Sequence, residues 1–212
     1  MSAPLRMPPV RRARRSHAER AAETQARIKA AVVEAIEAGG LQSVTAAEIS
    51  RRSGVSWGAA QHHFGDKDGI LTAVLVDSFN RLATGLEAIR VEGKTLAERA
   101  ALFVEAAWAH FDSGHYRSTF EILMNLSPAA DSRVDLALRE RTLEAWQSLW
   151  ARYFGEAGLP REREVALQIY TVSTLSGLAT LAKLEGGGRS RRGELEFLKD
   201  TLSRELGGAR PS

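Results

Sequence analysis

The stretch TAAEISRRSGVSWGAAQHHFGDKDGIL, residues 45–71, decides the fold of this 212-residue chain. Thr45 and Glu48 have the spacing of a capping box, in which the hydroxyl accepts from the Glu48 amide and the carboxylate accepts from the Thr45 amide. Gly54 predicts the end of this helix, because a residue without Cβ enters the left-handed region at little cost. Ser56 is typical of the N-cap of a second helix, over residues 57–63. Helix, glycine turn and helix indicate a helix-turn-helix, whose second helix enters the major groove of DNA.

The same stretch resembles the DNA-binding domain of the tetracycline-repressor (TetR) family of bacterial regulators. That family has a threonine opening its second helix, a Gly-Val-Ser turn, a recognition helix of small residues, then Tyr-His-His-Phe and Lys-x-x-Leu. The resemblance covers about residues 24–75. It departs from the family at Gln61, where tyrosine is usual, and at Trp57, where lysine is frequent. The matching residues are Thr45, Ile49, Gly54, Val55, Ser56, Gly58, His62, His63, Phe64, Lys67, Ile70 and Leu71.

The resemblance assigns roles in DNA binding to these positions. On the recognition helix, Gly58 would let the backbone approach base edges, and Ala59 would contact a thymine methyl. Side chains flanking that helix would hold phosphates, Lys67 being helped by exposed amides at the start of the next helix. The recognition-helix residues are Ser56, Trp57, Gly58 and Ala59, and the phosphate ligands are Thr45, Gln61, His62 and Lys67.

Charge is distributed unevenly along the chain. Residues 1–70 hold 11 Lys/Arg and 7 Asp/Glu, whereas residues 71–212 hold 18 and 19. A basic N-terminal third before a near-neutral remainder is typical of a nucleic-acid-binding domain on a neutral body. The chain has no cysteine, which excludes disulfides and thiolate metal sites. No long apolar segment follows the basic N-terminus as in a secretory signal, so we expect a cytoplasmic protein.

The apolar periodicity predicts an all-α protein of about nine helices, with no strand and no internal repeat. We expect residues 1–17 to form a basic arm, residues 18–66 a helix-turn-helix domain, and residues 67–212 an effector-binding and dimerisation domain. The helix starting at Lys67 would be a lever on the order of 30 Å long that joins the helix-turn-helix domain to the effector-binding domain. Besides the two helices of the motif, helices are expected over residues 18–38, 67–89, 95–112, 115–126, 131–154, 161–184 and 194–206.

The helix expected over residues 161–184 requires a partner. Residues 165–182 lack any charge, which approaches the length of a membrane span, but polar and small side chains interrupt the stretch throughout. A helix that is apolar or small on every face is buried in protein. We therefore predict that this helix and the helix over residues 194–206 form half of an isologous four-helix interface in a homodimer. We do not expect the helix to span a membrane. The family resemblance implies the same two C-terminal helices. The expected interface residues are Ile169, Val172, Ser176, Ala179, Leu195, Leu198 and Leu202.

Aromatic side chains gather in three neighbouring helices of the C-terminal part. Taken singly, aromatic residues at helical spacing most often form plain core. Together, in a domain that the resemblance says holds an effector, they indicate an apolar pocket with few polar groups. A flat or lipophilic effector fits such a lining better than a polyanion does. The expected lining residues are Phe103, Trp108, Phe111, Tyr116, Phe120, Met124, Trp146 and Trp150.

Neither a metal site nor an active site is indicated. His62 and His63 are adjacent on a helix and point about 100° apart, so they cannot share one ion well. The glycines at 186–188 follow a helix, whereas a nucleotide-binding turn follows a strand. Nothing resembles a nucleophile elbow. We therefore expect no metal, no cofactor and no enzymatic activity.

The best hypothesis is a homodimeric one-component regulator, in this family usually a repressor. It would bind a palindromic operator in double-stranded DNA and be released by a small apolar effector. Within regulation, the alternatives are an activator or a DNA binder without an effector. Outside it, they are a helical ligand-binding or interaction protein with no DNA role, and a small-molecule-modifying enzyme.

The N-terminal segment is basic and rich in proline. Residues 1–16 contain Arg11, Arg12, Arg14 and Arg15 and no acidic residue. One interpretation is a solvated tail, since such a segment cannot bury enough apolar surface to fold alone. Because the arginines stand directly before the DNA-binding domain, we favour an arm that enters the minor groove, as in homeodomains.

Deletion of residues 1–15 distinguishes the two interpretations. A minor-groove arm predicts a larger loss of affinity for operators with A·T-rich flanks, whose narrow minor groove attracts arginine. The measurement is a competition between two operators that differ only in their flanks, with full-length and truncated protein. An equal loss for both operators, fading above ~0.2 M salt, would show that the segment is only a charged tail.

Overall fold

The computed structural model describes residues 16–125, 136–186 and 189–208, with only the backbone of residues 136–142. Arg11, Arg12, Arg14 and Arg15 of the predicted arm lie outside the described residues. Where described, the chain is all-α and contains no strand, which confirms the predicted fold class. The helices are α1 His17–Gly39, α2 Ala46–Ser53, α3 Trp57–Phe64, α4 Lys67–Glu87, α5 Leu96–Phe111, α6 Gly114–Asn125, α7 Leu136–Phe154, α8 Arg161–Leu184 and α9 Arg192–Gly207, with 3-10 turns at Leu41–Ser43 and Gly155–Ala157.

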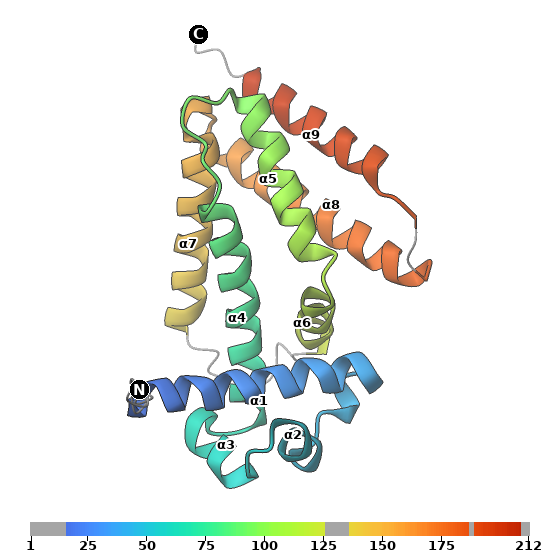
Figure 1. The fold of residues 1–212 in the computed structure, drawn as a ribbon. Helices are drawn as coiled ribbons and strands as arrows, with labels where there is room; N and C mark the ends of the chain where they lie inside the picture. Colours follow the sequence, from blue (N-terminus) through green and yellow to red (C-terminus); the bar gives the residue numbers. More distant parts are fainter. Residues whose placement is uncertain (1–15, 126–135, 187–188, 209–212) are drawn as a thin grey trace, which may run out of the picture.

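The helices form two groups that α4 connects (Figure 1). The first, α1–α3, lies at one end of the molecule with α1 across the foot of α4, and the second, α5 and α7–α9, lies around the far end of α4. Helix α6 stands between them, above α1. We call the first group the head and the rest of the described chain the body. The predicted connecting helix is therefore present, although α4 ends at Glu87, two residues before its predicted end.

Local hydrogen bonds explain where the head helices begin. Ser16 and Glu19 form a complete capping box, so α1 starts at His17. At α2, Thr45 Oγ1 accepts from the Glu48 amide at 3.2 Å as predicted. The reciprocal half of this second capping box is absent.

The Glu48 carboxylate is engaged elsewhere. Instead of accepting from the Thr45 amide, it accepts from Arg51 at 2.6 Å and from Arg52 at 2.5 Å. These hydrogen bonds lower the pKa of Glu48 to about 2. The predicted box was therefore wrong in this half, because two nearby guanidinium groups compete better for a carboxylate than one backbone amide does.

Buried apolar side chains form two separate clusters. One fills the body, where α4, α5, α7, α8 and α9 meet. The other fills the head, but two of its contributors come from outside α1–α3. The foot of α4 supplies Ile70, Leu71 and Val74, and α6 supplies Ile122, whose side chain is fully buried. The head core is thus closed by the two body helices that stand on it.

Polar contacts reinforce the same joint between head and body. Glu121 on α6 accepts a hydrogen bond of 2.6 Å from the Leu41 amide, just after α1. Lys29 on α1 pairs with Asp77 on α4. At the start of α6, a Cβ on Gly114 would lie 2.2 Å from the Glu37 carboxylate of α1, which would have to move to make room. The start of α6 and the last turns of α1 are therefore in close contact.

Ile122→Ala tests the contribution of α6 to the head core. Removing most of a fully buried isoleucine should lower the free energy of unfolding by about 2–5 kcal/mol, because it leaves a cavity. Urea denaturation would measure the loss. Leu123→Ala is the matched control, since the neighbouring side chain is 50% exposed and should cost about 0.5 kcal/mol or less. Equal losses would show that α6 does not close the head core.

Candidate nucleic-acid interface

Helix α3 presents one bare side to the exterior. Gly58, Gln61 and His62 are exposed and lie at the i, i+3, i+4 spacing of a single helix face. A Cβ placed on Gly58 would meet nothing within 4 Å, so the backbone here is open to a partner. Ala60 is fully buried in the head core, and Phe64 packs against it. One side of α3 thus anchors the helix and the other is free for contact.

The turn before α3 forms as the sequence predicted. Gly54 has φ +64°, in the left-handed region. Val55 is buried in the head core. Ser56 caps α3 by accepting from the Ala59 amide at 3.3 Å. The turn is therefore fixed by one glycine, one apolar side chain and one hydroxyl.

The turn after α3 depends on a residue that sequence reasoning missed. A Cβ on Gly69, in the first turn of α4, would lie 2.0 Å from the Phe64 carbonyl oxygen, too close for any residue but glycine. Its only sequence signal is a glycine inside a predicted helix, where glycine is usually unfavourable. Gly69 therefore lets α4 begin directly against the end of α3.

The other residues predicted to contact DNA differ in how much of each side chain is exposed. Thr45 is exposed at the N-cap of α2, and Ser56 is exposed at the N-cap of α3. Trp57 and Ala59 are half-buried and pack against the head core, so only part of each side chain is accessible. Lys67 is half-buried as the first residue of α4. In Figure 1, α2 and α3 lie at the end of the molecule away from the C-terminus, and α4 rises from that end into the body.

The surroundings of Lys67 are less electropositive than predicted. Asp66 and Asp68 flank it, and the Asp66 carboxylate accepts from the Gly69 amide at 2.8 Å. This bond occupies one of the amides that we expected to support a phosphate. The amides of Lys67 and Asp68 remain, because the first amides of a helix have no intrahelical acceptor. Lys67 therefore contributes charge, with limited help from the helix terminus.

The rings of the two adjacent histidines are directed differently. The rings of His62 and His63 lie 5.7 Å apart at an interplanar angle of 63°, and the ring of His63 packs edge-on to Phe64. Throughout the described segments, no group of three or more His, Asp or Glu side chains is placed to hold a metal ion. His62 remains exposed on the outer side of α3.

The aromatic residues predicted to line an effector pocket mostly fill the body core. Phe103 is fully buried and packs edge-on against Trp146 and Trp150, with ring centroids 6.0 and 5.7 Å apart. Phe111 is also buried, at 4% exposure. The expectation of one apolar pocket was therefore wrong for these residues, because their rings satisfy one another. One polar pair lies beside these rings: Trp146 Nε1 donates to Gln168 Oε1 at 2.9 Å.

The remaining residues of the predicted pocket, three aromatic side chains and Met124, are divided between two surface cavities. Trp108 lines one of about 520 Å³, beside the loop between α8 and α9. Tyr116, Phe120 and Met124 line another of about 570 Å³, where the end of α1 meets α6 and α8. Both cavities also carry charged side chains, unlike the weakly charged lining that we expected. The second cavity touches both head and body.

The predicted dimer interface also needs correction. Leu198 and Leu202 are fully buried in the body core, and Ala179 is 5% exposed. Ser176 shares a 2.7 Å hydrogen bond with the hydroxyl of Tyr116 on α6. These four side chains face their own chain, because α5 and α6 cover that side of α8 and α9. The periodicity of the sequence could not reveal which apolar face the chain itself covers.

A different face of α8 is uncovered, and it includes Ile169 at 62% exposure. Val172 and Leu195, also predicted, are half-buried. Phe197 on α9 is 64% exposed. We call the uncovered α8 residues the α8 stripe; they are Ala166, Ile169, Tyr170, Ser173, Gly177, Leu181 and Leu184.

Helix α8 also has the length and composition of a membrane-spanning helix. Its most apolar 18-residue window has a mean hydropathy of 1.4, and a third of that window is buried within the chain. One such helix is weak evidence for a membrane, because core helices of other proteins meet the same criterion. Its small and polar residues, Ser173 and Gly177 among them, suit contact with another helix.

Comparison with known proteins bears on the head first. Residues 28–74 match the family described as bacterial regulatory proteins, tetR family. A stretch of 52 residues is 44% identical to the HTH-type transcriptional regulator BetI of Escherichia coli. That stretch is 24% of this chain and 27% of BetI, so the match spans only about a quarter of the length of this relative.

Solved structures extend the likeness to the whole fold. A protein from Vibrio parahaemolyticus described as a TetR-family transcriptional regulator superposes with a TM-score of 0.63, at 19% identity over 86% of this chain and 97% of that one. The superantigen PfiT superposes with a TM-score of 0.61, at 18% identity over 84% and 94%. At such identities only the fold is shared. The helix-turn-helix of this chain therefore belongs to the tetR family of bacterial regulatory proteins, and the described chain as a whole has the fold of a solved protein of that family.

Proposed function

We propose that the protein is a one-component transcriptional repressor of the cytoplasm. As a homodimer it binds a palindromic operator in double-stranded DNA. It is released from the operator when a small apolar effector binds to the body of the protein. The observation that carries the proposal is α3: a short helix held by its buried side, with Gly58, Gln61 and His62 exposed on the other. Such a helix can lie in the major groove with its backbone close to the bases.

The chemistry of the interface supports separate roles for its residues. Gly58 and Ala59 face base edges, where a small side chain permits close approach and a methyl group can meet thymine. Thr45, Ser56, Gln61, His62 and Lys67 lie around α3 and hold phosphates or polar base edges. Trp57 supports α3 from the head core and offers its exposed part to the backbone of the DNA.

A second copy of the chain is proposed to cover the α8 stripe. Ile169 and Leu184, at 62% and 77% exposure, are large apolar side chains left in water. Ser173 and Gly177 between them allow another helix to approach closely. Two copies related by a two-fold axis would bury both stripes against each other. The two α3 helices of the dimer would then each contact one half of a palindromic operator.

The joint provides a route from the body to the DNA-binding helix. Ile122 of α6 and Val74 of α4 belong to the head core, so a shift of α6 or α4 repacks the support of α3. Suppose that a ligand binds one arrangement of α6 and α4 more tightly than the other. The ratio of its two affinities then sets the largest factor by which it can change the affinity for DNA. Absence of catalysis is part of the proposal, since regulators of this kind act by binding alone.

The fold alone does not carry this proposal, because the superantigen PfiT shares it. The residues of the head carry it. A helical ligand-binding protein without a DNA role would have no need of a recognition helix with a bare outer side. An activator would use the same interface, and only transcription measurements would distinguish it from a repressor.

Gly58→Leu should abolish specific binding to DNA from upstream of the protein's own coding sequence. The added side chain enters open space in the free protein, so the fold remains, but it would occupy the room that base edges need. Fluorescence anisotropy against this DNA and a scrambled duplex would measure the effect. Gly85→Leu is the matched control, on an exposed helical position of α4 with nothing within 4 Å. If the Gly58 and Gly85 variants bind equally well, α3 is not the recognition helix.

Lys67→Ala should weaken binding to all DNA sequences by a similar factor. The lysine would neutralise about one phosphate, so the slope of log affinity against log salt should fall by about one. The same anisotropy assay, repeated from low to moderate salt, gives this slope. Arg90→Ala, an exposed arginine of the body, should leave it unchanged. A loss restricted to one sequence would assign Lys67 to base recognition instead.

Gly177→Glu should convert the homodimer to monomer. In one chain the position is exposed and a Cβ meets nothing, so the protomer tolerates glutamate. In the dimer the carboxylate would be buried without a partner, at a cost of about 3 kcal/mol or more. Light scattering would give the mass, with Gly85→Glu as control. A dimer that persists with the Gly177 variant would place the interface elsewhere.

A further inference from the structure

The cavity where the end of α1 meets α6 and α8 lies between head and body, and we call it the joint cavity. Its volume of about 570 Å³ is within the range of small-molecule sites. Residues from three stretches of the described chain line it: 36–42 in the head, and 116–124 and 179–184 in the body. A molecule bound there would therefore contact head and body at once.

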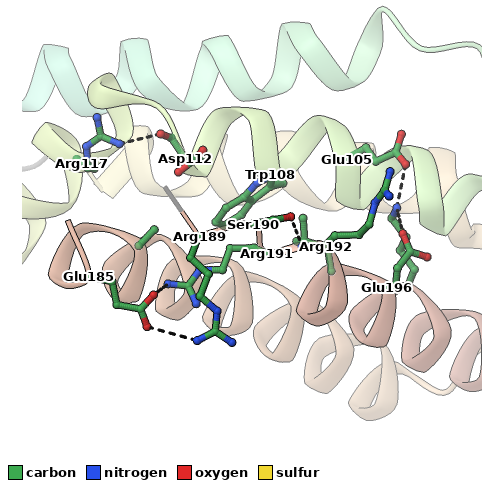
Figure 2. Close-up of a pocket in the computed structure, with 13 residues that line it drawn as sticks. Glu105, Trp108, Asp112, Arg117, Glu185, Arg189, Ser190, Arg191, Arg192 and Glu196 are labelled. Atoms are coloured by element: carbon green, nitrogen blue, oxygen red, sulfur yellow. Dashed lines mark hydrogen bonds and ion pairs between the residues drawn. The ribbon is translucent and has the colours of Figure 1, made fainter. Parts of the chain in front are cut away.

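The other places that could hold a ligand are filled or internally paired. In the body core, Phe103 and Trp150 are buried against each other, with ring centroids 5.7 Å apart. In the cavity of about 520 Å³, Glu185 pairs with Arg191 at 2.6 Å and with Arg189 at 3.9 Å (Figure 2). The joint cavity differs from both, because its lining keeps exposed apolar surface and an unused hydrogen-bonding group.

The apolar surface comes mainly from α6. Tyr116, Phe120 and Met124 follow one another at four-residue spacing, so they line the cavity from one face of this helix. The rings of Tyr116 and Phe120 lie 6.3 Å apart at an interplanar angle of 31°. Met124 is 69% exposed. Covering an apolar side chain that is left in water is favourable, so this face favours an apolar ligand.

The charges in the lining balance one another. They are the carboxylates of Glu37 and Glu121 and the cations of Arg117 and Lys183. The Glu121 carboxylate also accepts from a backbone amide at 2.6 Å, and Arg117 donates to a backbone carbonyl at 2.8 Å. An ion of either sign would meet as many like charges as opposite ones, and it would lose part of its hydration on binding. The lining therefore favours an uncharged molecule.

Gln42 offers such a molecule a polar contact. Its side chain is exposed in the lining, and within the described segments its amide has no hydrogen-bond partner. A Cβ placed on Gly40 would lie 2.9 Å from Glu121 Oε1 and 3.1 Å from Gln42 Oε1, which brings the amide next to α6. Because an amide both donates and accepts, Gln42 can bind a hydroxyl, carbonyl or amide group of a ligand.

Helix α6 connects the joint cavity to the head core. Phe120 and Ile122 are two positions apart, so their side chains point about 160° apart on the helix. Phe120 lines the cavity, whereas Ile122 is buried in the head core. A ligand that shifts α6 would therefore repack the core that supports α3.

The joint cavity lies beside the proposed dimer contact on α8. Leu184 belongs to both surfaces. Ala179 and Lys183, which also line the cavity, point about 160° and 120° away from Gly177 in the middle of the α8 stripe. A second copy seated on the stripe would therefore not cover the side of α8 that carries these two residues.

We propose that the joint cavity binds an uncharged, mainly apolar small molecule with one hydrogen-bonding group. Its apolar part lies on Phe120 and Met124, and its polar group contacts Gln42. This binding does not depend on any role in DNA recognition. The identification of this molecule as the effector that releases the operator rests on the proposed function.

The test follows the methyl signal of Met124 in the full chain by NMR. The chain has three methionines, so Met124→Leu assigns the signal. The probe is uncharged 2-naphthylmethanol; 2-naphthylmethylamine and 2-naphthoate carry the same ring with a positive or a negative group. The alcohol should shift the signal saturably, with a Kd below roughly 1 mM, and should bind at least as tightly as either ion.

Ala38→Phe tests whether the probe occupies the cavity. Ala38 lines the cavity from α1 and is exposed, so the added ring takes up cavity space without entering the core. It should weaken binding of the alcohol about tenfold. Ala30→Phe is the matched control, since Ala30 is an exposed alanine of α1 outside the lining, and it should leave the affinity unchanged. Gln42→Ala should weaken binding about threefold, the size of one hydrogen bond.

The titrations can overturn each part of the proposal. No saturable shift of Met124 up to roughly 10 mM alcohol, or an unchanged affinity in the Ala38→Phe protein, would show that the cavity is not the site. A tenfold preference for either naphthyl ion would show that the ligand class is wrong. An unchanged affinity in the Gln42→Ala protein would contradict the placement of the polar group.

A titration with specific DNA bound tests the effector role. The alcohol should then bind about fivefold more weakly, because linkage between two sites is reciprocal. Equal affinity with and without DNA would contradict the effector role. If the protein binds no DNA sequence specifically, the proposed function fails, whereas the titration without DNA still decides whether the cavity is a ligand site.

Discussion

The position of the head on the body depends on the burial of Ile122 in the head core. This side chain belongs to α6, yet it is fully enclosed by α1 and its neighbours. An apolar side chain of this size is worth about 1.5–3 kcal/mol when removed from water, so the head is stabilised by remaining in contact with α6. The foot of α4 contributes to the same core through Ile70 and Val74. Two body helices therefore contribute to the position of a DNA-binding unit made of one long helix, α1, and two of eight residues, α2 and α3. Helix α3, which carries the exposed face, is too short to be stable alone.

Polar groups at the joint limit how the head can move. Asp77 of α4 pairs with Lys29 of α1 and with Arg81. Next to this network His110 is half-buried beside Ser78, and burial, with His115 and Arg81 adding charge repulsion, lowers the pKa of His110 to about 4. The histidine is therefore neutral at neutral pH, and the joint keeps a fixed pattern of charge there. In the proposed regulator, a signal from the body would reach the head through packing, since a small rotation of α6 would act on Ile122 directly.

The sequence predicted the fold well where local chemistry determines structure. Ser56 and Gly54 act on residues within a few positions, and the cap and the turn that they were expected to form are present. Prediction was poorer where the outcome depends on which helix covers which face. Leu198 and Leu202 have the periodicity of an interface, but α5 covers them; Phe103 has the periodicity of a pocket wall, but other rings enclose it. Gly69 and Ile122 were missed for the same reason, since their roles come from contacts with other helices that no local pattern encodes.

Selection of bound DNA from a random pool by the full-length protein tests the central claim most directly, because it assumes neither an operator nor an effector. The account predicts enrichment of a two-fold symmetric sequence whose half-sites lie about one helical turn, roughly 10 base pairs, or a multiple of it apart, as two α3 helices of a symmetric dimer would require. Recovery of DNA without any enriched sequence would show that binding is only electrostatic. That result would contradict the assignment of α3 as a recognition helix and of the chain as a regulator.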